Sequence, residues 1–419
     1  MHVSSRVLLL SCLAACLPIF TDVQEAAAQA FGIELHNTLM PASGAMGGAS
    51  LARPQDVQSA INGNPATLSR FTGNHFGFGG AWGEATYKVS HTGGVIPGIG
   101  AFSAKSNAQG AALGNIAATQ DLRPLGIPGT FGIALISSSG AGVSFRRVAA
   151  SNGTSALIQA LQIVPSVGLD LTENVSVGAN IMLGSATLDG PFVSITGAAY
   201  DYALRGSLGV TYEAGEDTTL SAYYQTIQSF VFDEAVIIAP PAGPPMISSI
   251  DLDLPDNVGV GIANESLMDG KLLLAFDVLF KQWDNADLFK NIYQNQWVFQ
   301  FGAQYKYNEY VRLRAGYVFA ENAIEPNPGG SAGGQNPAGG QPAIEYVQAQ
   351  FAAINEHRIS GGVGIEDLLP NVDFDLFAGG MFGTSQEFGA FTSATVASYW
   401  IGAGVTWHFD GPSTEPAYQ

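Results

Sequence analysis

Apolar and polar residues alternate one by one along many short segments of this chain, and this rhythm limits its fold more than any other feature. Between residues 200 and 213 the even positions are apolar, aromatic or glycine, whereas the odd positions are small, polar or charged. Further segments repeat the pattern, at 271–281, 296–306, 311–319, 372–376 and 399–409. Side chains with a period of two point to opposite faces of a β-strand, so each segment predicts a strand with one apolar and one wetter face.

Composition indicates the solvent in which such strands are stable. Only 12% of the 419 residues are charged and 47% are hydrophobic, whereas about a quarter are charged in an ordinary soluble protein. After the N-terminus no stretch supplies the roughly 18 consecutive apolar residues of a membrane-spanning helix. A closed barrel is the other structure that satisfies every backbone group inside a bilayer. The sequence therefore predicts a barrel of the bacterial outer membrane.

Two kinds of connection join the predicted strands. Short polar turns alternate with longer connections, which we place at 186–199, 233–248, 321–355 and 384–396. This asymmetry is typical of outer-membrane barrels. Counting segments from Asn74 to Phe409 gives 14 strands. We predict an all-β fold, a 14-stranded antiparallel transmembrane β-barrel with an N-terminal hatch of short helices that plugs the lumen. A further short helix is predicted within 343–354.

The chain divides into four parts by pattern. Residues 1–30 are interpreted as a signal peptide, with Arg6, an apolar stretch and an A-x-A cleavage site that leaves Phe31 as the first mature residue. A lipoprotein site that would make Cys16 a lipidated N-terminus is the alternative. Residues 31–72 lack the alternation and form the predicted hatch or plug, residues 73–409 the barrel, and residues 410–419 a C-terminal extension.

Charge and motifs bound the chemistry. A net charge of -19 argues against nucleic acid as a partner. The histidines lie in no metalloprotease or nucleophile-elbow motif, so we expect no enzyme, no cofactor and no metal site. A lipid hydrolase stays open as a less favoured alternative, because catalytic triads are not read from spacing.

Five cations are predicted to face the lumen, where a ligand carboxylate would need a partner: Arg205, Lys281, Arg312, Arg314 and Arg358. The alternative is that these cations pair with lumenal acids such as Asp277, Asp373 and Asp375.

Particular motifs resemble the FadL/TodX family of outer-membrane hydrophobic-compound transporters. These are Phe31 to Asn37, residues 42–52 and, most specifically, Asn64, Pro65 and Ala66 before the first strand. Residues 251–261, 271–283, 310–317 and 399–409 resemble later strands of that family.

The resemblance implies a monomeric 14-stranded barrel, a lumen plugged by the hatch, and Phe31 reaching into a ligand pocket. It also implies an early strand kinked for lateral release to the membrane. The matching strand here is 130–145, where the alternation is interrupted by Ser137, Ser138, Ser139 and Gly140.

The resemblance further implies an apolar groove between the long loops. The candidate residues come from the two most apolar loops: Phe192, Val193, Ile195, Val236, Ile237, Ile238 and Met246. The expected function is passive, hatch-gated uptake of long-chain fatty acids or other hydrophobic small molecules. Expected partners are a fatty acid, alkane or aromatic hydrocarbon, outer-membrane lipids and lipopolysaccharide, and the barrel assembly machinery, whose signal would be internal because ten residues follow Phe409. A general or structural porin is the alternative.

Overall fold

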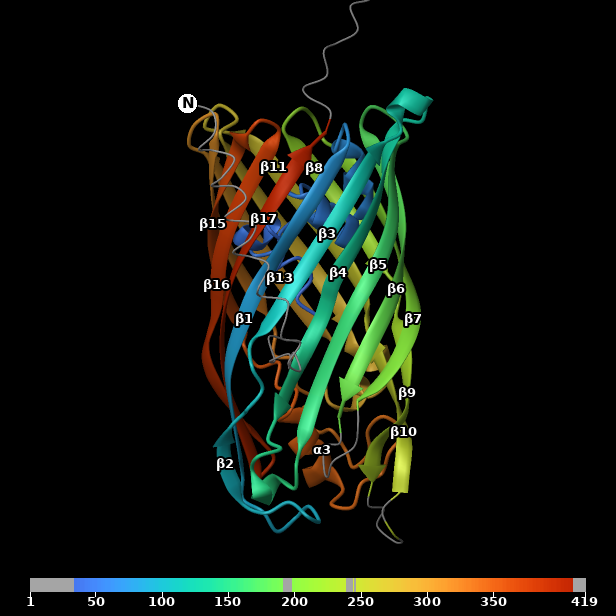
Figure 1. Ribbon diagram of the computed structural model, residues 1–419, viewed down its shortest axis with the longest axis vertical. Helices are drawn as coiled ribbons and strands as arrows, with labels where there is room; N and C mark the ends of the chain where they lie inside the picture. Colours follow the sequence, from blue (N-terminus) through green and yellow to red (C-terminus); the bar gives the residue numbers. More distant parts are fainter. Residues whose placement is uncertain (1–33, 191–197, 239–243, 245, 410–419) are drawn as a thin grey trace, which may run out of the picture.

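The computed structural model describes residues 34–190, 198–238, 244 and 246–409, which form a closed antiparallel barrel (Figure 1). Its 14 strands within these residues follow one another around the wall in chain order. They are β1 (His75–His91), β3 (Ala111–Asp121), β4 (Gly129–Ser144), β5 (Ser155–Asp170), β6 (Val175–Asp189), β7 (Ala199–Glu213), β8 (Thr218–Gln225), β11 (Asp256–Leu267), β12 (Leu272–Gln282), β13 (Gln296–Lys306), β14 (Val311–Ala320), β15 (His357–Leu369), β16 (Val372–Phe388) and β17 (Thr392–His408). The predicted strand number is confirmed.

The barrel closes along a long seam between its first and last strands. β1 and β17 pair from His75 opposite His408 to His91 opposite Thr392, without a break in register. The short strand β2 (Phe102–Lys105) extends the sheet along β1 near one end. β9 (Gln228–Ile238) and β10 (Met246–Leu254) form a separate hairpin that projects beyond the wall.

The two ends of the barrel differ in their connections. At the upper end of Figure 1, tight turns and the 3-10 turn η4 (Arg123–Leu125) join neighbouring strands. At the opposite end lie the long loops, with η5 (Ala149–Ser151), η6 (Trp283–Asn285), η7 (Phe289–Asn291) and the helix α3 (Gln341–Gln348). We call these the turn end and the loop end.

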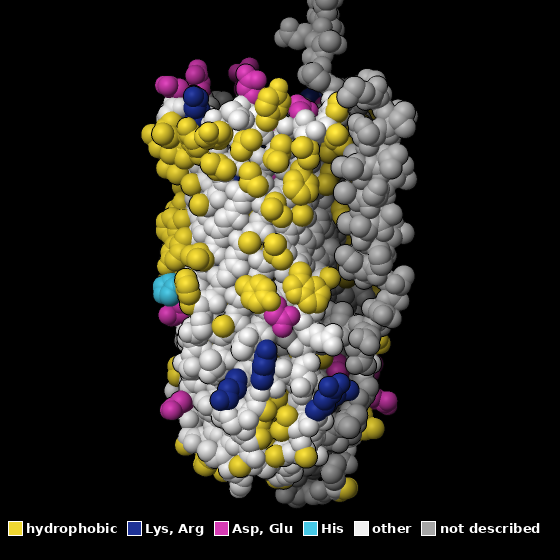
Figure 2. Space-filling view, turned by 60° about the vertical axis from the view of Figure 1, so that its left-hand side comes forward, with side chains coloured by type: hydrophobic (Ala, Val, Ile, Leu, Met, Phe, Trp, Pro, Cys, Tyr) yellow, Lys and Arg dark blue, Asp and Glu magenta, His cyan; other side chains and the backbone are white. Residues whose placement is uncertain are grey.

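The outer wall carries the apolar faces of the strands. On β7 the outward-pointing Tyr202 and Leu204 are 70% and 65% exposed. The next residue, Arg205, points inward and is buried. Hydrophobic side chains gather in a broad band nearer the turn end (Figure 2). Such a band around a closed barrel is the surface of a protein that spans a membrane. In the part of the chain that the structure describes, no helix has the length and apolar character to cross a membrane.

Two predicted loops contain strands, and both predictions were wrong. Residues 384–396 belong mainly to β16 and β17, and residues 233–248 contain the ends of β9 and β10. Around Ser385, Gln386 and Glu387 polar residues occupy both faces of β16, so alternation disappears although the backbone pairing with β17 persists. The end of β9 is a continuous apolar run from Ala235 to Ile238, so the period of two is absent there as well. The predicted helix within 343–354 is present but begins and ends earlier, at Gln341 and Gln348.

Candidate functional site

The lumen of the turn-end half is occupied by residues 34–72, which we call the plug segment. It contains three short helical turns, η2 (Ser43–Met46), α2 (Val57–Asn62) and η3 (Pro65–Arg70), which lie inside the wall (Figure 1). Asp56 organises it locally, because its carboxylate caps α2 by accepting from the Ser59 N–H at 2.7 Å and also accepts from the Ser43 N–H at 2.8 Å. One side chain thereby fixes two turns against each other.

Asn64, Pro65 and Ala66 seat the end of the plug segment against the wall. The Asn64 Oδ1 accepts from the Ala66 N–H at 3.1 Å, and its Nδ2 donates to the backbone oxygens of Leu51 at 3.0 Å and Val210 of β7 at 3.2 Å. Proline suits the first position of such a turn because that position needs no N–H donor. The wall makes room with glycine: a Cβ on Gly209 would lie 1.8 Å from the Asn64 Oδ1.

Wall side chains bind the backbone of the plug segment from several strands. The Asp277 Oδ2 of β12 accepts from the Ser50 and Leu51 N–H groups at 2.6 and 2.9 Å. Gln300 of β13 donates to the Gly47 oxygen at 3.0 Å, and Asn180 of β6 donates to the Ile61 oxygen at 2.8 Å. Because buried backbone groups need partners, these bonds set the position of the plug segment.

Glu34, the first described residue, meets two of the predicted lumenal cations. The Arg205 Nη1 donates to the Glu34 Oε1 at 2.7 Å, and the Lys281 Nζ lies 3.7 Å from the Oε2. Asn257 donates to the same Oε2 at 2.9 Å. Burial acts to raise the pKa of the Glu34 carboxyl, but Arg205 and Lys281 outweigh it and hold the pKa at about 2. Glu34 is therefore ionised at any physiological pH.

The other three predicted cations separate into two groups. Arg312 and Arg314 lie near the turn end of β14 and pair with Glu366 and Asp375. Arg358 of β15 is only 8% exposed and has no hydrogen bond or ion pair to any described residue. Its register partners are Val318 and Met381, which are buried and apolar. Arg358 is thus a buried cation between apolar register partners and close enough to Lys281 to interact with its charge, an expensive arrangement unless an anion joins it.

The predicted alternative acids take different roles. Only Asp375 pairs with one of the five cations, Arg314. Asp373 binds His408, with the His408 Nε2 2.8 Å from the carboxylate. Asp277 holds the plug backbone instead, which sequence reasoning missed because a carboxylate facing a lumen gives no sign of which donor it meets.

The lumen of the loop-end half is filled by apolar side chains, which we call the loop core. Its large buried members come from β9, β10, the 283–295 loop and the segment around α3: Phe230, Phe232, Ile250, Leu252, Trp283, Leu288, Phe289, Ile292, Tyr293, Ile344, Val347, Phe351 and Ile354. Hydrogen bonds to backbone groups also hold it, for example from the Gln348 side chain to the Ile292 oxygen at 3.0 Å. The Tyr87 hydroxyl donates to the Ala349 oxygen at 2.8 Å and accepts from the Ala352 N–H at 2.7 Å.

The structure describes the side chains of only some of the predicted groove residues. Val236 is buried in the loop core, whereas Met246, which pairs with Ile238 two residues further along β9, is 58% exposed. Ile237 and Ile238 lie at the end of β9, and only their backbone is described. Phe31, Phe192, Val193 and Ile195 lie outside the described residues. Sequence reasoning missed the aromatic group of Trp283, Phe289 and Tyr293. These three bulky side chains lie close together in the connection between the predicted strands 271–281 and 296–306, which could have indicated a packed loop.

The predicted kink coincides with an irregularity of β4. The pairing of β4 with β5 shifts register between Ser137 and Ser139, which is a β-bulge at Ser138. β3 pairs with β4 only from Asn115 opposite Ile136 towards the turn end. On the turn side of the bulge Ser137 still donates to the Gly114 oxygen, at 3.1 Å. The strands β3 and β4 therefore separate on the loop side of the bulge.

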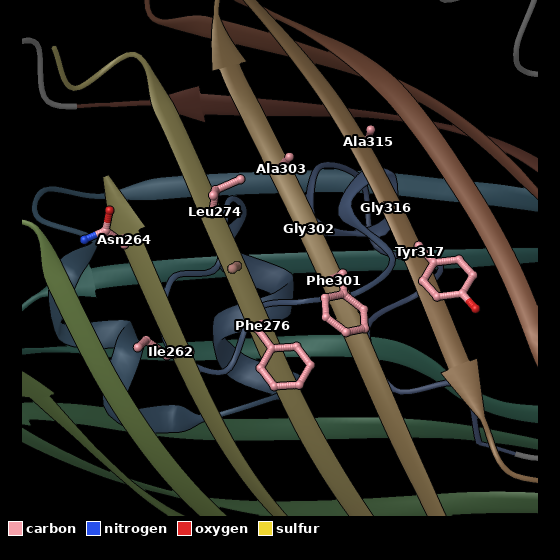
Figure 3. A pocket seen from close by; sticks show the side chains of 11 residues that line it. Ile262, Asn264, Leu274, Phe276, Phe301, Gly302, Ala303, Ala315, Gly316 and Tyr317 are labelled. Atoms are coloured by element: carbon pink, nitrogen blue, oxygen red, sulfur yellow. The ribbon is translucent and has the colours of Figure 1, made fainter. Parts of the chain in front are cut away.

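A groove of about 540 Å³ lies on the outer wall rather than in the lumen. Small residues such as Gly302 and Gly316 form its floor, and Leu274, Phe301 and Tyr317 project beside it (Figure 3). These three side chains are exposed, so the groove faces outward. Its lining is mostly apolar, which suits an acyl chain of the surrounding bilayer.

Comparison with known proteins identifies structures with the same architecture. No family model and no curated protein matches the sequence. The toluene transporter TodX from Pseudomonas putida superposes with a TM-score of 0.64 at 17% identity, covering 92% of this chain and 100% of that one. A FadL homologue from Pseudomonas aeruginosa gives 0.63 at 14% identity, covering 90% and 100%.

The toluene transporter TbuX from Ralstonia pickettii gives a TM-score of 0.59 at 17% identity, covering 88% of this chain and 98% of that one. These matches extend over nearly the whole chain, so they confirm the resemblance at the level of the fold. In its fold, this chain matches the barrels of the FadL type.

Proposed function

We propose that this protein is an outer-membrane channel for the passive uptake of hydrophobic small molecules, and that long-chain fatty acids are the ligands it suits best. The observation that carries the proposal is the position of Arg358. A buried cation without a partner among the described residues lies four residues after Ile354, a member of the loop core. A fatty acid offers both an apolar tail and a carboxylate.

The orientation follows from the two ends of the barrel. In outer-membrane barrels short turns face the periplasm and long loops face the cell exterior. The loop core is then met first by a ligand from outside, and the plug segment closes the periplasmic side. An apolar tail gains roughly 0.8 kcal/mol for each methylene that leaves water. No nucleotide or other energy source is part of the proposal, so flow follows the concentration gradient.

Charge in the middle of the lumen supports a role for a carboxylate. Arg205, Lys281 and Arg358 are buried there, and Glu34 is the one carboxylate that pairs with them among the described residues. A ligand carboxylate would offset part of this excess positive charge. The contribution of Phe31, three residues before Glu34 in the chain, remains a prediction.

Lateral release is proposed at β4. The bulge at Ser138 and the separation of β3 from β4 leave strand edges unpaired near the loop core. Unpaired edges in a membrane wall are tolerated where they line an opening. Movement of the plug segment would be the second requirement for passage, because its wall contacts close the lumen below Arg358.

The proposal is tested by uptake of labelled oleate in cells that lack their own fatty-acid channel. Expression of this protein should restore uptake, Arg358→Leu should reduce it about tenfold or more, and Arg358→Lys should keep most of it, since a charge-assisted contact is worth roughly 1.5–3 kcal/mol. Failure of the wild-type protein to restore uptake would refute the proposal.

Neutral aromatic hydrocarbons are the second candidate, because toluene is the substrate named for TodX and TbuX. Toluene carries no charge, so its uptake should be the same in wild type and Arg358→Leu. Uptake of toluene but not oleate by the wild-type protein would select this candidate. A general porin would instead admit sugars, and rapid swelling of sugar-loaded liposomes would favour it.

A further inference from the structure

Two lysines stand opposite each other on the outer wall at the loop end. Lys88 of β1 and Lys105 of β2 are direct register partners, and both side chains are exposed. Like charges directly opposite in an antiparallel pair repel each other. Neither lysine forms an ion pair with any described residue. The pair therefore concentrates positive charge on a chain whose net charge is -19.

Two arginines continue this positive charge around the wall. The Ser106 N–H donates to the Tyr87 oxygen of β1 at 2.7 Å, and the next N–H, of Asn107, donates to the Ser144 oxygen of β4 at 2.8 Å. These bonds place the end of β4 beside the segment that follows β2. Arg146 and Arg147 follow directly, and Arg147 is exposed and has no ion pair among the described residues. We call Lys88, Lys105, Arg146 and Arg147 the basic patch.

A hollow adjoins the basic patch and supplies neutral donors. Its volume is about 450 Å³, and its lining includes Asn107, Gln109, Gln159 and Thr187 beside the two arginines. Asp189 is the acid at this hollow, and it pairs with Arg146. The described lining thus keeps an excess of positive charge, together with the amide and hydroxyl groups that bind anionic oxygen atoms.

The basic patch lies just beyond the hydrophobic band. On β5 the outward residues Leu161 and Ile163 are exposed and apolar, and the next outward residue towards the loop end is Gln159 of the hollow. On β1 the band ends near Trp82, and Lys88 lies six residues further. Figure 2 shows basic side chains gathered on the loop side of the band. This is the depth at which lipid headgroups meet a barrel.

We propose that the basic patch binds the phosphate groups of lipopolysaccharide in the outer leaflet. Guanidinium and ammonium groups are the side chains that recognise phosphate, the arginines with two parallel hydrogen bonds. Bound phosphate offsets the repulsion between Lys88 and Lys105. The assignment needs only a barrel in an outer leaflet and is independent of which molecule crosses the lumen.

The test compares two double variants with equal loss of charge. Lys88→Gln with Lys105→Gln removes half of the basic patch, and Lys271→Gln with Lys306→Gln removes two lysines at the turn end. Binding of lipopolysaccharide to the immobilised full chain in nonionic detergent is measured for each. The first variant should bind roughly twentyfold more weakly, since a basic residue near an anionic membrane surface contributes roughly fivefold. The second should bind as wild type does.

Further arms distinguish the source of the phosphate. Lipid A stripped of phosphate should bind wild type and both variants equally weakly, and Arg147→Gln should lower lipopolysaccharide affinity by itself. Folding of each variant is verified by the heat-dependent shift of the barrel on a gel. Equal lipopolysaccharide binding by the two double variants would overturn the proposal. Displacement of lipopolysaccharide by an equal concentration of inorganic phosphate would overturn it too, because it would indicate a free-anion site.

Discussion

The two halves of the lumen are filled in opposite ways. The loop core fills its half with aromatic and aliphatic side chains such as Phe289 and Phe351, whose rings meet edge to face at 5.9 Å. The plug segment fills the other half with a small-residue backbone that wall side chains such as Asp277 and Gln300 bind one group at a time. Both halves are closely packed, but the loop core consists mainly of apolar side chains, whereas polar wall side chains hold the backbone of the plug segment.

The difference teaches which half can exchange its contents. An apolar ligand that enters the loop core replaces one set of van der Waals contacts by another, so little free energy is lost. Removal of the plug segment would leave the Asp277 carboxylate without the Ser50 and Leu51 donors and the Arg205 guanidinium without the Glu34 carboxylate. Each unpaired buried group costs a large share of a protein's stability. The loop core is therefore suited to exchange and the plug segment to closure.

The largest expected effect comes from Arg205→Met. It leaves the buried Glu34 carboxylate without its closest cation, and breaking a buried pair costs about 3–5 kcal/mol. The plug segment should loosen, and the ion conductance of the protein in planar bilayers should rise. Glu34→Gln with Arg205→Met removes both charges and should be less leaky than Arg205→Met alone. A single variant as tight as wild type would contradict the anchoring role.

Asp277→Ala should have the next largest effect. It removes the acceptor of the Ser50 and Leu51 N–H groups, and each buried donor without a partner costs about 1–3 kcal/mol. Limited proteolysis from the periplasmic side should cut the plug segment faster than in wild type. Asp277→Asn keeps an acceptor oxygen and should be cut at an intermediate rate. Equal rates for all three proteins would show that other contacts hold the segment.

Gly209→Ala tests the seat of Asn64 with a single methyl group. The added Cβ would collide with the Asn64 Oδ1, and overpacking of this kind costs about 1–3 kcal/mol. Gly114→Ala is the matched control, because a Cβ there meets nothing within 4 Å. Thermal unfolding of the two purified variants should differ by several degrees, with Gly209→Ala lower. Identical midpoints would mean that Asn64 moves aside without loss.

The smallest effect is expected in the loop core, where a substitution should strengthen ligand binding and should not make the barrel leaky. Phe351→Leu opens a small cavity and loosens the core by about 1 kcal/mol. A ligand that must displace the core should then bind about fivefold more tightly, while the ion conductance stays at the wild-type value. Weaker ligand binding in this variant would mean that Phe351 contacts the ligand directly.

Much of the barrel could be predicted from sequence, because lipid outside and a filled lumen inside impose a period of two on every strand within the band. The prediction failed at residues 384–396, where Ser385, Gln386 and Glu387 place polar groups on both faces of a paired strand. β-pairing beyond the membrane needs no apolar face, so no pattern marks it.

The candidate site was harder to predict. The five inward cations could be found from alternation, but their partners come from strands far apart in the chain. Glu34 meets Arg205 across 171 residues, and Asp277 meets Ser50 across 227. A sequence indicates which face a side chain occupies and not which segment lies opposite. Arg358 was identified as inward-facing, and only the structure reveals that, unlike Arg314, it has no acid partner among the described residues.

The seam between β1 and β17 has a consequence for how the molecule is made. These strands lie more than 300 residues apart, so the circle cannot be completed until the whole chain has been delivered. The plug segment immediately precedes β1 and is hydrogen-bonded to β6, β7, β12 and β13, to β7 through the Asn64 side chain and to the others through its backbone. The plug segment must therefore lie inside the sheet before β1 and β17 pair. During biogenesis the sheet must therefore wrap around the plug segment of the same chain.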